Sequence, residues 1–194
     1  MKKYNHYEFH DDCVYVFPQG RDDVYAILDY KWYQYFSERN IYISPKRDRD
    51  NGVYWCYCEG EHKTIKVHSI ICCKGCDHIN GNKSDNRECN LRPATNRQNS
   101  RNRGPTRINK TGYKGVQKEG DGFCVQIRTR DRLLYFGHFD SAEDAAKVYD
   151  LAALKYFGEF AWTNFSKDAY NVEDINKVEP STMSNRRRSY GKKG

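Results

Sequence analysis

The 194-residue sequence lacks any apolar stretch long enough to cross a lipid bilayer. Its first residues, MKKYNHYEFHDD, also lack the apolar run of a secretory signal peptide. We therefore expect a soluble, intracellular protein without a membrane partner. A chain of this length can bury one medium core or two small ones, and we expect two compact modules with tails.

Acidic residues are absent between Leu91 and Lys118, although the whole chain carries 26 of them against 33 Lys and Arg. Basic residues are concentrated in this segment, and the chain has a net charge of +7. Each Lys or Arg that neutralises a phosphate releases a condensed counterion, so such a segment attracts polyanions. The alternative interpretation is a solvated basic linker.

Disulfide pairing is not what we expect of the eight cysteines, because intracellular thiols are kept reduced. Cys73 and Cys76 have the spacing of a zinc knuckle, and Cys56 and Cys58 lie on one face of an expected strand. Four thiolates could close a structural Zn²⁺ site. The alternative is that these side chains, like the other cysteines of the chain, are small apolar fillers.

The N-terminal region, residues 1–65, has aromatic and β-branched runs separated by turn residues. This pattern predicts a β-rich region of short antiparallel strands. We assign no site residues to this region. The strands are expected at residues 14–17, 24–28, 41–43 and 53–57.

Residues 66–103 have a different pattern. Residues 66–71 are strand-like, a strand ends at Asp77-His78, and a polar loop leads to a second strand near Asn90. Thr95 can cap a helix that runs through Asn99 towards Arg103. The pattern predicts a hairpin followed by a helix.

Residues 104–112 are expected to be a basic linker, and residues 113–165 a second module of three short strands and one helix. Ser141 and Asp144 resemble a capping box, and apolar residues then recur at spacings of three and four up to Tyr156. A three-stranded sheet covered by this helix would bury that face. Residues 166–194, with basic clusters at 186–188 and 192–193, are expected to be a mobile tail.

The Asp77-His78 pair has the chemistry that phosphodiester hydrolysis needs. Neighbouring residues at a strand end point to opposite faces, so one side chain could hold a metal and the other a water. A His base and one oxygen-ligated cation activate water and stabilise the developing charge. Asn99 could return an amide oxygen to the metal, and Asn90 lies near the second strand.

The string from Asp77 to Arg92, followed by Asn96-Arg97-Gln98-Asn99, closely resembles the HNH homing endonucleases of bacteriophages and group I introns. The resemblance implies a ββα-metal (His-Me finger) core in which His78 is the general base and Asn90 holds the loop that orients it. Asp77 and Asn99 would be ligands of Mg²⁺ or Mn²⁺. Arg97, Arg101 and Arg103 would hold DNA backbone phosphates.

His68 stands where this family often has a His followed by Arg, but Ser69 replaces the Arg. We therefore interpret His68 as structural and leave it outside the site.

The C-terminal module resembles the plant ethylene-response-factor type DNA-binding domain over residues 113–165. The resemblance is carried by residues 111–116, 126–128, 135–139, 141–153 and 157–165. It implies a three-stranded sheet that lies in the major groove of DNA, supported by the helix. By position, the DNA contacts would come from Lys114, Gln117, Gln126, Arg128, Tyr135 and, on the helix, Tyr149.

Gln117, Gln126 and Tyr135 stand where the plant pattern has Arg and Trp, so the recognised sequence does not transfer. The alternative is a sheet that only packs against the nuclease.

Together these patterns predict an α+β protein that is a site-selective DNA endonuclease of the homing type. We expect it to act as a monomer on double-stranded DNA, with no small-molecule substrate, in the cytoplasm of a bacterial or phage-infected cell. One rival interpretation is a DNA-binding regulator with a degenerate nuclease scaffold. Another is a zinc-stapled RNA-binding protein. Whether one strand or both are cut stays open.

Overall fold

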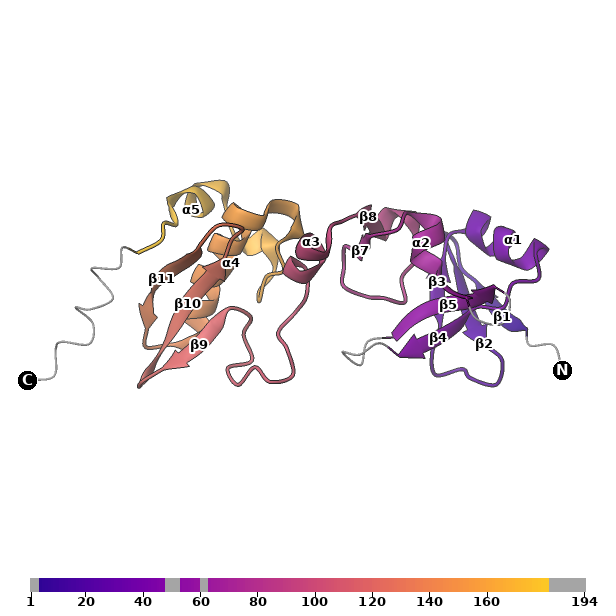
Figure 1. Cartoon of the computed structure of the whole chain (residues 1–194), viewed down its shortest axis with the longest axis horizontal. Helices are drawn as coiled ribbons and strands as arrows, with labels where there is room; N and C mark the ends of the chain where they lie inside the picture. The colour runs from indigo at the N-terminus through magenta and orange to yellow at the C-terminus, as the bar shows by residue number, and fades with distance from the viewer. Residues whose placement is uncertain (1–3, 48–52, 60–62, 182–194) are drawn as a thin grey trace, which may run out of the picture. The chain divides into compact units, whose positions relative to one another are not determined.

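The computed structural model describes residues 4–47, 53–59 and 63–181. The chain forms two compact units, residues 1–99 and 100–194 (Figure 1). No helix in the described part of the chain is both long and apolar enough to span a membrane. The clusters expected in the mobile tail, residues 186–188 and 192–193, lie outside the described residues.

Two antiparallel sheets form most of the first unit. Strands β1 (Asn5–Phe9), β2 (Val14–Pro18) and β3 (Ala26–Leu28) make one sheet, in the order β1-β2-β3. Strands β4 (Ser44–Arg47), β5 (Val53–Glu59) and β6 (Lys63–Lys66) make the other, in the order β4-β5-β6. One core joins them, in which Trp55, Leu28 and Val14 are fully buried.

The N-terminal region is less purely β than the sequence predicts. Helix α1 (Tyr30–Glu38) follows β3, and it was not expected because its run of aromatic residues is typical of strands. Residues 41–43 are not a strand, although Ile43 is buried in the core, and β4 begins at Ser44.

Residues 66–71, expected to be strand-like, instead form the end of β6 and the short helix α2 (Val67–Ile71). Apolar runs this short carry no period that separates a strand from a buried helix turn, so the strand interpretation was wrong. The hairpin follows, with β7 (Cys76–His78) paired to β8 (Leu91–Pro93). The turn η1 (Glu88–Asn90) precedes β8, and helix α3 (Asn96–Arg101) follows it.

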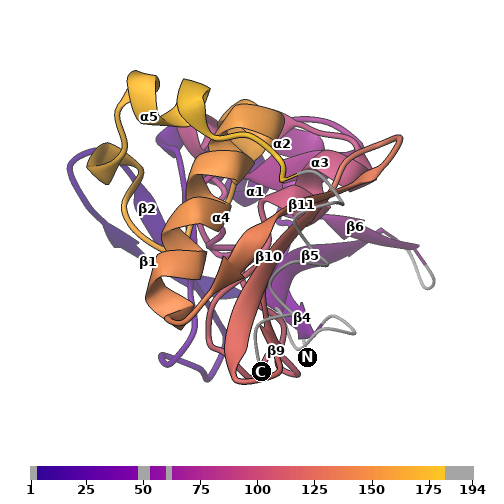
Figure 2. The same ribbon diagram turned by 90° about the vertical axis from the view of Figure 1, so that its left-hand side faces the viewer.

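The second unit is a three-stranded antiparallel sheet with one long helix. The strands are β9 (Val116–Glu119), β10 (Gly122–Arg128) and β11 (Leu133–Phe139), in the order β11-β10-β9. Helix α4 (Ala142–Phe157) lies across one face of the sheet (Figure 2). The Ser141 side chain caps it by accepting from the backbone N–H groups of Glu143 and Asp144, and Gly158 ends it.

Asp150 of α4 is fully buried and fastens the chain that follows the helix. Its Oδ1 accepts from the backbone N–H of Asn164 at 2.8 Å, and its Oδ2 accepts from the N–H of Phe165 and the hydroxyl of Tyr170, both at 2.9 Å. Burial raises the pKa of this carboxyl, and these donors act in the opposite direction.

Two segments expected to lack structure contain local order. In the expected linker 104–112, the Asn109 side chain donates to the Tyr113 carbonyl and Thr111 to the Val116 carbonyl. The short turn η2 (Gly158–Phe160) follows α4 within the second module. The expected tail, residues 166–194, contains η3 (Lys167–Ala169) and α5 (Val172–Lys177). A cap from Asn171 to Asp174 starts α5, although the segment has no apolar period.

Gly115 should be one of the least replaceable residues of the second unit. A Cβ on Gly115 would lie 1.9 Å from Cδ2 of Tyr149, and its φ is +75°. We expect Gly115→Ala to lower the free energy of unfolding by about 2–5 kcal/mol, from overpacking and left-handed strain together. Gly112→Ala is the matched control, because its φ is +77° but nothing lies within 4 Å. It should cost only about 1–2 kcal/mol in chemical denaturation, and equal losses would contradict the steric explanation.

Candidate active site

The β7–β8 hairpin places Asp77 and His78 next to each other in the interior, with exposures of 3% and 5%. Asp77 is paired across the hairpin with Arg92. Arg92 donates to Oδ2 of Asp77 from Nη2 at 2.8 Å and from Nε at 3.1 Å. The carboxylate is therefore held in a fixed orientation by a buried guanidinium.

The ring of His78 lies against a buried asparagine. His78 Nε2 is 3.4 Å from Oδ1 of Asn86, a residue with no exposed surface. Asn86 also donates from Nδ2 to the Ser84 carbonyl at 3.0 Å, so its amide orientation is set by the loop. Burial lowers the pKa of His78, which favours the neutral ring that a general base requires.

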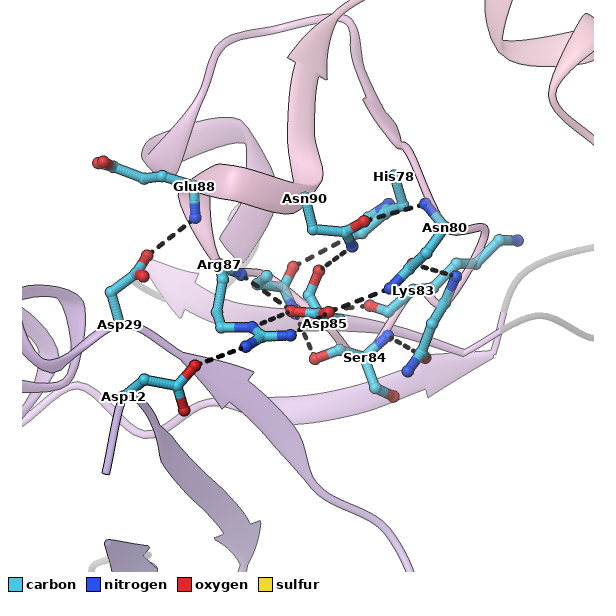
Figure 3. A network of polar contacts seen from close by, with 12 residues as sticks. Asp12, Asp29, His78, Asn80, Lys83, Ser84, Asp85, Arg87, Glu88 and Asn90 are labelled. Atoms are coloured by element: carbon cyan, nitrogen blue, oxygen red, sulfur yellow. Dashed lines mark hydrogen bonds and ion pairs between the residues drawn. The ribbon is translucent and has the colours of Figure 1, made fainter. Parts of the chain in front are cut away.

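The loop between β7 and β8 is closed by Asn90 (Figure 3). Asn90 Oδ1 accepts from the backbone N–H of Asn80 at 2.9 Å, and its Nδ2 donates to the Asp85 carbonyl at 2.8 Å. The backbone N–H of Ile79 donates to the Asn90 carbonyl at 2.8 Å. One asparagine thus bridges both ends of the loop that begins at His78.

The N-terminal sheet holds the same loop from outside. The backbone N–H of Ile27 in β3 donates to the Ser84 carbonyl at 2.8 Å, and the N–H of Asn86 donates to the Ile27 carbonyl at 2.9 Å. The backbone N–H of Glu88 donates to Oδ2 of Asp29 at 2.8 Å. The N-terminal region therefore supports the site, a role for which the sequence carries no local signal.

An ion pair between buried Asp85 and half-buried Arg87 lies in the loop (Figure 3). Asp85, 2% exposed, accepts from Arg87 Nε at 2.9 Å and Nη2 at 3.0 Å, and from Asn80 Nδ2 at 3.1 Å. Arg87 also contacts Asp12 at 3.2 Å. Burial acts to raise the pKa of Asp85, but these donors outweigh it and hold that pKa below its usual value. Sequence reasoning missed Asp85 and Asn86, because loop Asp and Asn residues are common in ordinary turns.

Asn99 of α3 lies beside β7. Its Nδ2 donates to the carbonyl of Cys76 at 3.2 Å, one residue before Asp77. The amide oxygen of Asn99 and the carboxylate of Asp77 thus come from adjacent elements. Both are hard oxygen donors, which fit Mg²⁺ or Mn²⁺ better than a thiophilic ion.

No group of three or more His, Cys, Asp or Glu side chains forms a metal site within residues 4–47, 53–59 and 63–181. A cation held by Asp77 and Asn99 would therefore keep several water ligands.

The hypothesis of a four-cysteine zinc site is not supported by the arrangement of the thiols. Cys56 and Cys58 lie on β5, and Cys73 instead has its Sγ 3.7 Å from that of Cys72. Burial raises the pKa of the Cys76 thiol to about 12, which disfavours the thiolate that zinc binding requires. Cys56, Cys58, Cys73 and Cys76 do not gather as metal ligands.

His68, interpreted as structural, packs against the site. It is 6% exposed, and its ring centroid lies 5.1 Å from that of His78. Burial lowers its pKa to about 3. Tyr54 of β5 completes this group of rings, with its centroid 5.3 Å from His68 and 6.3 Å from His78.

In the second unit, one face of the sheet is turned away from α4. Val125 and Ile127 of β10 pack in the core with α4, so the alternate residues Gln126 and Arg128 lie on the outer face. Gln117 and Arg128 are exposed, and Gln126 and Tyr135 are half-buried. Four of the residues predicted to contact DNA are thus on one surface.

Lys114 and Tyr149, also predicted to contact DNA, do not lie on this outer face of the sheet. Tyr149 is 3% exposed and packs over Gly115, so it is a core residue. Lys114 Nζ donates to the Arg101 carbonyl and lies 5.8 Å from the Trp162 ring centroid. Neither residue lies with the four on the outer sheet face, because a family position does not specify which way a long side chain points; their contacts with DNA stay predictions.

The three arginines predicted to hold phosphates are not equivalent. Arg97 and Arg103 are exposed, on and just after α3. The Arg101 guanidinium lies 4.4 Å from the Phe157 ring centroid, so it packs within the second unit.

The half-buried Lys114 should leave a signature in the pH dependence of stability. Burial lowers its pKa to about 8, so between pH 8 and 10.5 the folded state binds fewer protons here than the unfolded state. Stability from this group therefore rises with pH, by at most about 1.4 kcal/mol per unit. The free energy of unfolding of wild type relative to Lys114→Met should increase from pH 7 to pH 10. Lys118→Met, at an exposed position, should show no such change.

Comparison with known proteins gives two kinds of relative, and no family model matches the chain. The AP2-like ethylene-responsive transcription factor ANT of Arabidopsis thaliana is 39% identical over 82 residues, 41% of this chain and 15% of that protein. The ethylene-responsive transcription factor WRI1 of the same plant is 36% identical over 104 residues, 51% of this chain. The chain spans less than a quarter of the length of these plant relatives.

The second kind of relative is an uncharacterized HNH endonuclease of Acanthamoeba polyphaga mimivirus. It is 34% identical over 139 residues, which cover 71% of this chain and 68% of the viral protein. Because the similarity extends over more than two thirds of both proteins, the chain belongs to the HNH endonuclease family.

Proposed function

We propose that this chain is a metal-dependent DNA endonuclease of the homing type, with a ββα-metal core in β7, β8 and α3. The observation that carries the proposal is the hairpin that buries Asp77 and His78 side by side, with Asn99 bonded to the adjacent Cys76 carbonyl. The viral HNH endonuclease relative supports a nuclease, and the plant transcription factor relatives support a DNA partner.

His78 is the general base of the proposed reaction. When its Nε2 donates to Oδ1 of Asn86, its Nδ1 carries the lone pair that accepts a proton from water. The lowered pKa of the ring keeps it neutral, and the Asn86 amide prevents it from turning. Asn90 holds the loop in the conformation that presents this ring.

Asp77 and Asn99 would hold one Mg²⁺ or Mn²⁺ ion, which supplies charge stabilisation for the phosphate under attack and its leaving 3′ oxygen. Arg92 fixes the Asp77 carboxylate so that its orientation does not depend on a flexible side chain. Neutralisation of Asp77 by Arg92 favours weak binding of the cation.

Site selection is assigned to the second unit. Its outer sheet face presents Gln117, Gln126, Arg128 and Tyr135, groups that can donate to or accept from base edges in a major groove. Arg97 and Arg103, which are exposed, would hold backbone phosphates. Gln117 and Gln126 favour adenine contacts, and Arg128 favours a guanine.

The nuclease proposal is tested by cleavage of supercoiled plasmid with Mg²⁺ or Mn²⁺. Wild type should relax or linearise the plasmid, and His78→Ala should lower the rate at least about 100-fold, because it removes the base. DNA binding by the variant should be retained. His10→Ala replaces an exposed histidine and should cleave like wild type. No cleavage by wild type, with binding intact, would favour a DNA-binding regulator with a degenerate nuclease scaffold.

The recognition proposal is tested by selecting a preferred duplex from a random pool and measuring affinities. Arg128→Ala should reduce the preference for that duplex by about 1–3 kcal/mol, roughly 5- to 150-fold, and relax selectivity at one position. Lys147→Ala is the control, because Lys147 lies on α4 and pairs there with Glu143. An equal loss of preference in both variants would reject the sheet face as the reading surface.

A further inference from the structure

We propose that Lys66 and Lys83, gathered on the ring of Tyr54 beside His78, form a binding site for one backbone phosphate of the DNA. The inference rests on the proposed function, and it assigns part of the N-terminal region to the substrate site. The proposed ligand is a phosphodiester of the cleaved duplex, and the sequence pattern assigned no role to either lysine.

The two ammonium groups converge from different parts of the chain. Lys66 ends β6, and Lys83 belongs to the loop between β7 and β8. Each Nζ lies 4.2 Å from the ring centroid of Tyr54. Since both distances are measured from one point, the two charges are within about 8 Å of each other, where they repel.

The Tyr54 ring offsets only part of that repulsion, because cation–π contacts at exposed sites contribute about 0.5–1 kcal/mol. Lys66 makes no ion pair among the residues that the structure describes. An anion that contacts both ammonium groups would reduce their mutual repulsion. A phosphodiester has this charge and several acceptor oxygens.

The site adjoins the proposed base. The Tyr54 centroid is 6.3 Å from that of His78, and the His68 ring contacts both of them, with its centroid 5.3 Å from Tyr54 and 5.1 Å from His78. Burial is the main cause of the lowered pKa of His68, and the charges of Lys66 and Lys83 act in the same direction. A phosphate held by Lys66 and Lys83 would thus lie close to the phosphate that His78 helps to cleave.

His68 supplies an independent sign of a missing ligand. Its Nδ1 is buried and has no hydrogen-bond partner among the residues that the structure describes. A buried polar atom without a partner costs about 1–3 kcal/mol. A phosphate oxygen, or a water that the phosphate orients, would satisfy this nitrogen.

The surrounding sheet face is basic rather than acidic. Lys46 of β4 is paired in register with Tyr54, and its Nζ donates to the Thr64 hydroxyl at 2.7 Å. Lys46, Tyr54 and Lys66 are on the same face of the β4-β5-β6 sheet. Lys46 is paired with Tyr54, and Lys66 is paired with Cys56, which lies two residues after Tyr54 and so on the same face. Lys63 lies three residues before Lys66 in β6 and therefore on the opposite face, where it forms an ion pair with Glu59.

The test is the salt dependence of binding to a 30-base-pair duplex, in chelator so that nothing is cleaved. Each lysine that releases a counterion contributes about 0.9 to the slope of log K against log salt. Lys66→Gln and Lys83→Gln should each reduce the slope by about one, and the double variant by about two. Lys63→Gln removes an equal charge from the other face and should leave the slope unchanged. Lys83→Arg should retain the wild-type slope.

An unchanged slope in the folded double variant would overturn the proposal, as would an equal decrease with Lys63→Gln. The result is separable from the nuclease test. Reduced slopes without plasmid cleavage would keep the phosphate site and reject the nuclease. Cleavage with unchanged slopes would keep the nuclease and reject only this site.

Discussion

The backbone pairing between Ile27 and the segment 84–86 is the constraint on which the proposed nuclease site depends. The loop between β7 and β8 is long and polar, and by itself it would lose much conformational entropy on ordering. Pairing with β3 fixes its middle, Asn90 joins its two ends, and the ion pair of buried Asp85 with Arg87 links residues within it. Asn86, which belongs to this loop, contacts Nε2 of His78 through its Oδ1 and so sets the orientation of the His78 ring.

The second unit also has a buried carboxylate that orders a neighbouring segment of the chain. Asp150, fully buried, accepts from backbone N–H groups of the segment after α4 and fastens that segment to the helix. In both units a carboxylate in the interior is satisfied by several donors, so that its desolvation is offset and the loops around it adopt one conformation. The surfaces proposed to contact DNA are thereby presented by rigid supports.

The sequence was most informative where local pattern and chemistry agree. Ser141 and the apolar period after it located α4, and Asp77-His78 could be placed at a strand end from the motif alone. Contacts between distant segments could not be foreseen, and these include the pairing of β3 with the loop and the packing of Lys114 against Trp162. Aromatic residues in α1 were misleading because strand propensity there gives way to burial on one helix face.

The support that β3 gives to the loop also limits where this chain can be divided into separately folding parts. Residues 66–103 contain every member of the motif, yet a fragment that begins there would lack Ile27, Asp29 and Asp12, which hold residues 84–88. Such a fragment would expose the edge groups of the loop and leave Arg87 with fewer partners. The motif segment, residues 66–103, is therefore not an independent folding unit in this chain. An exchange of the proposed nuclease half between proteins, natural or engineered, has to include the N-terminal sheet.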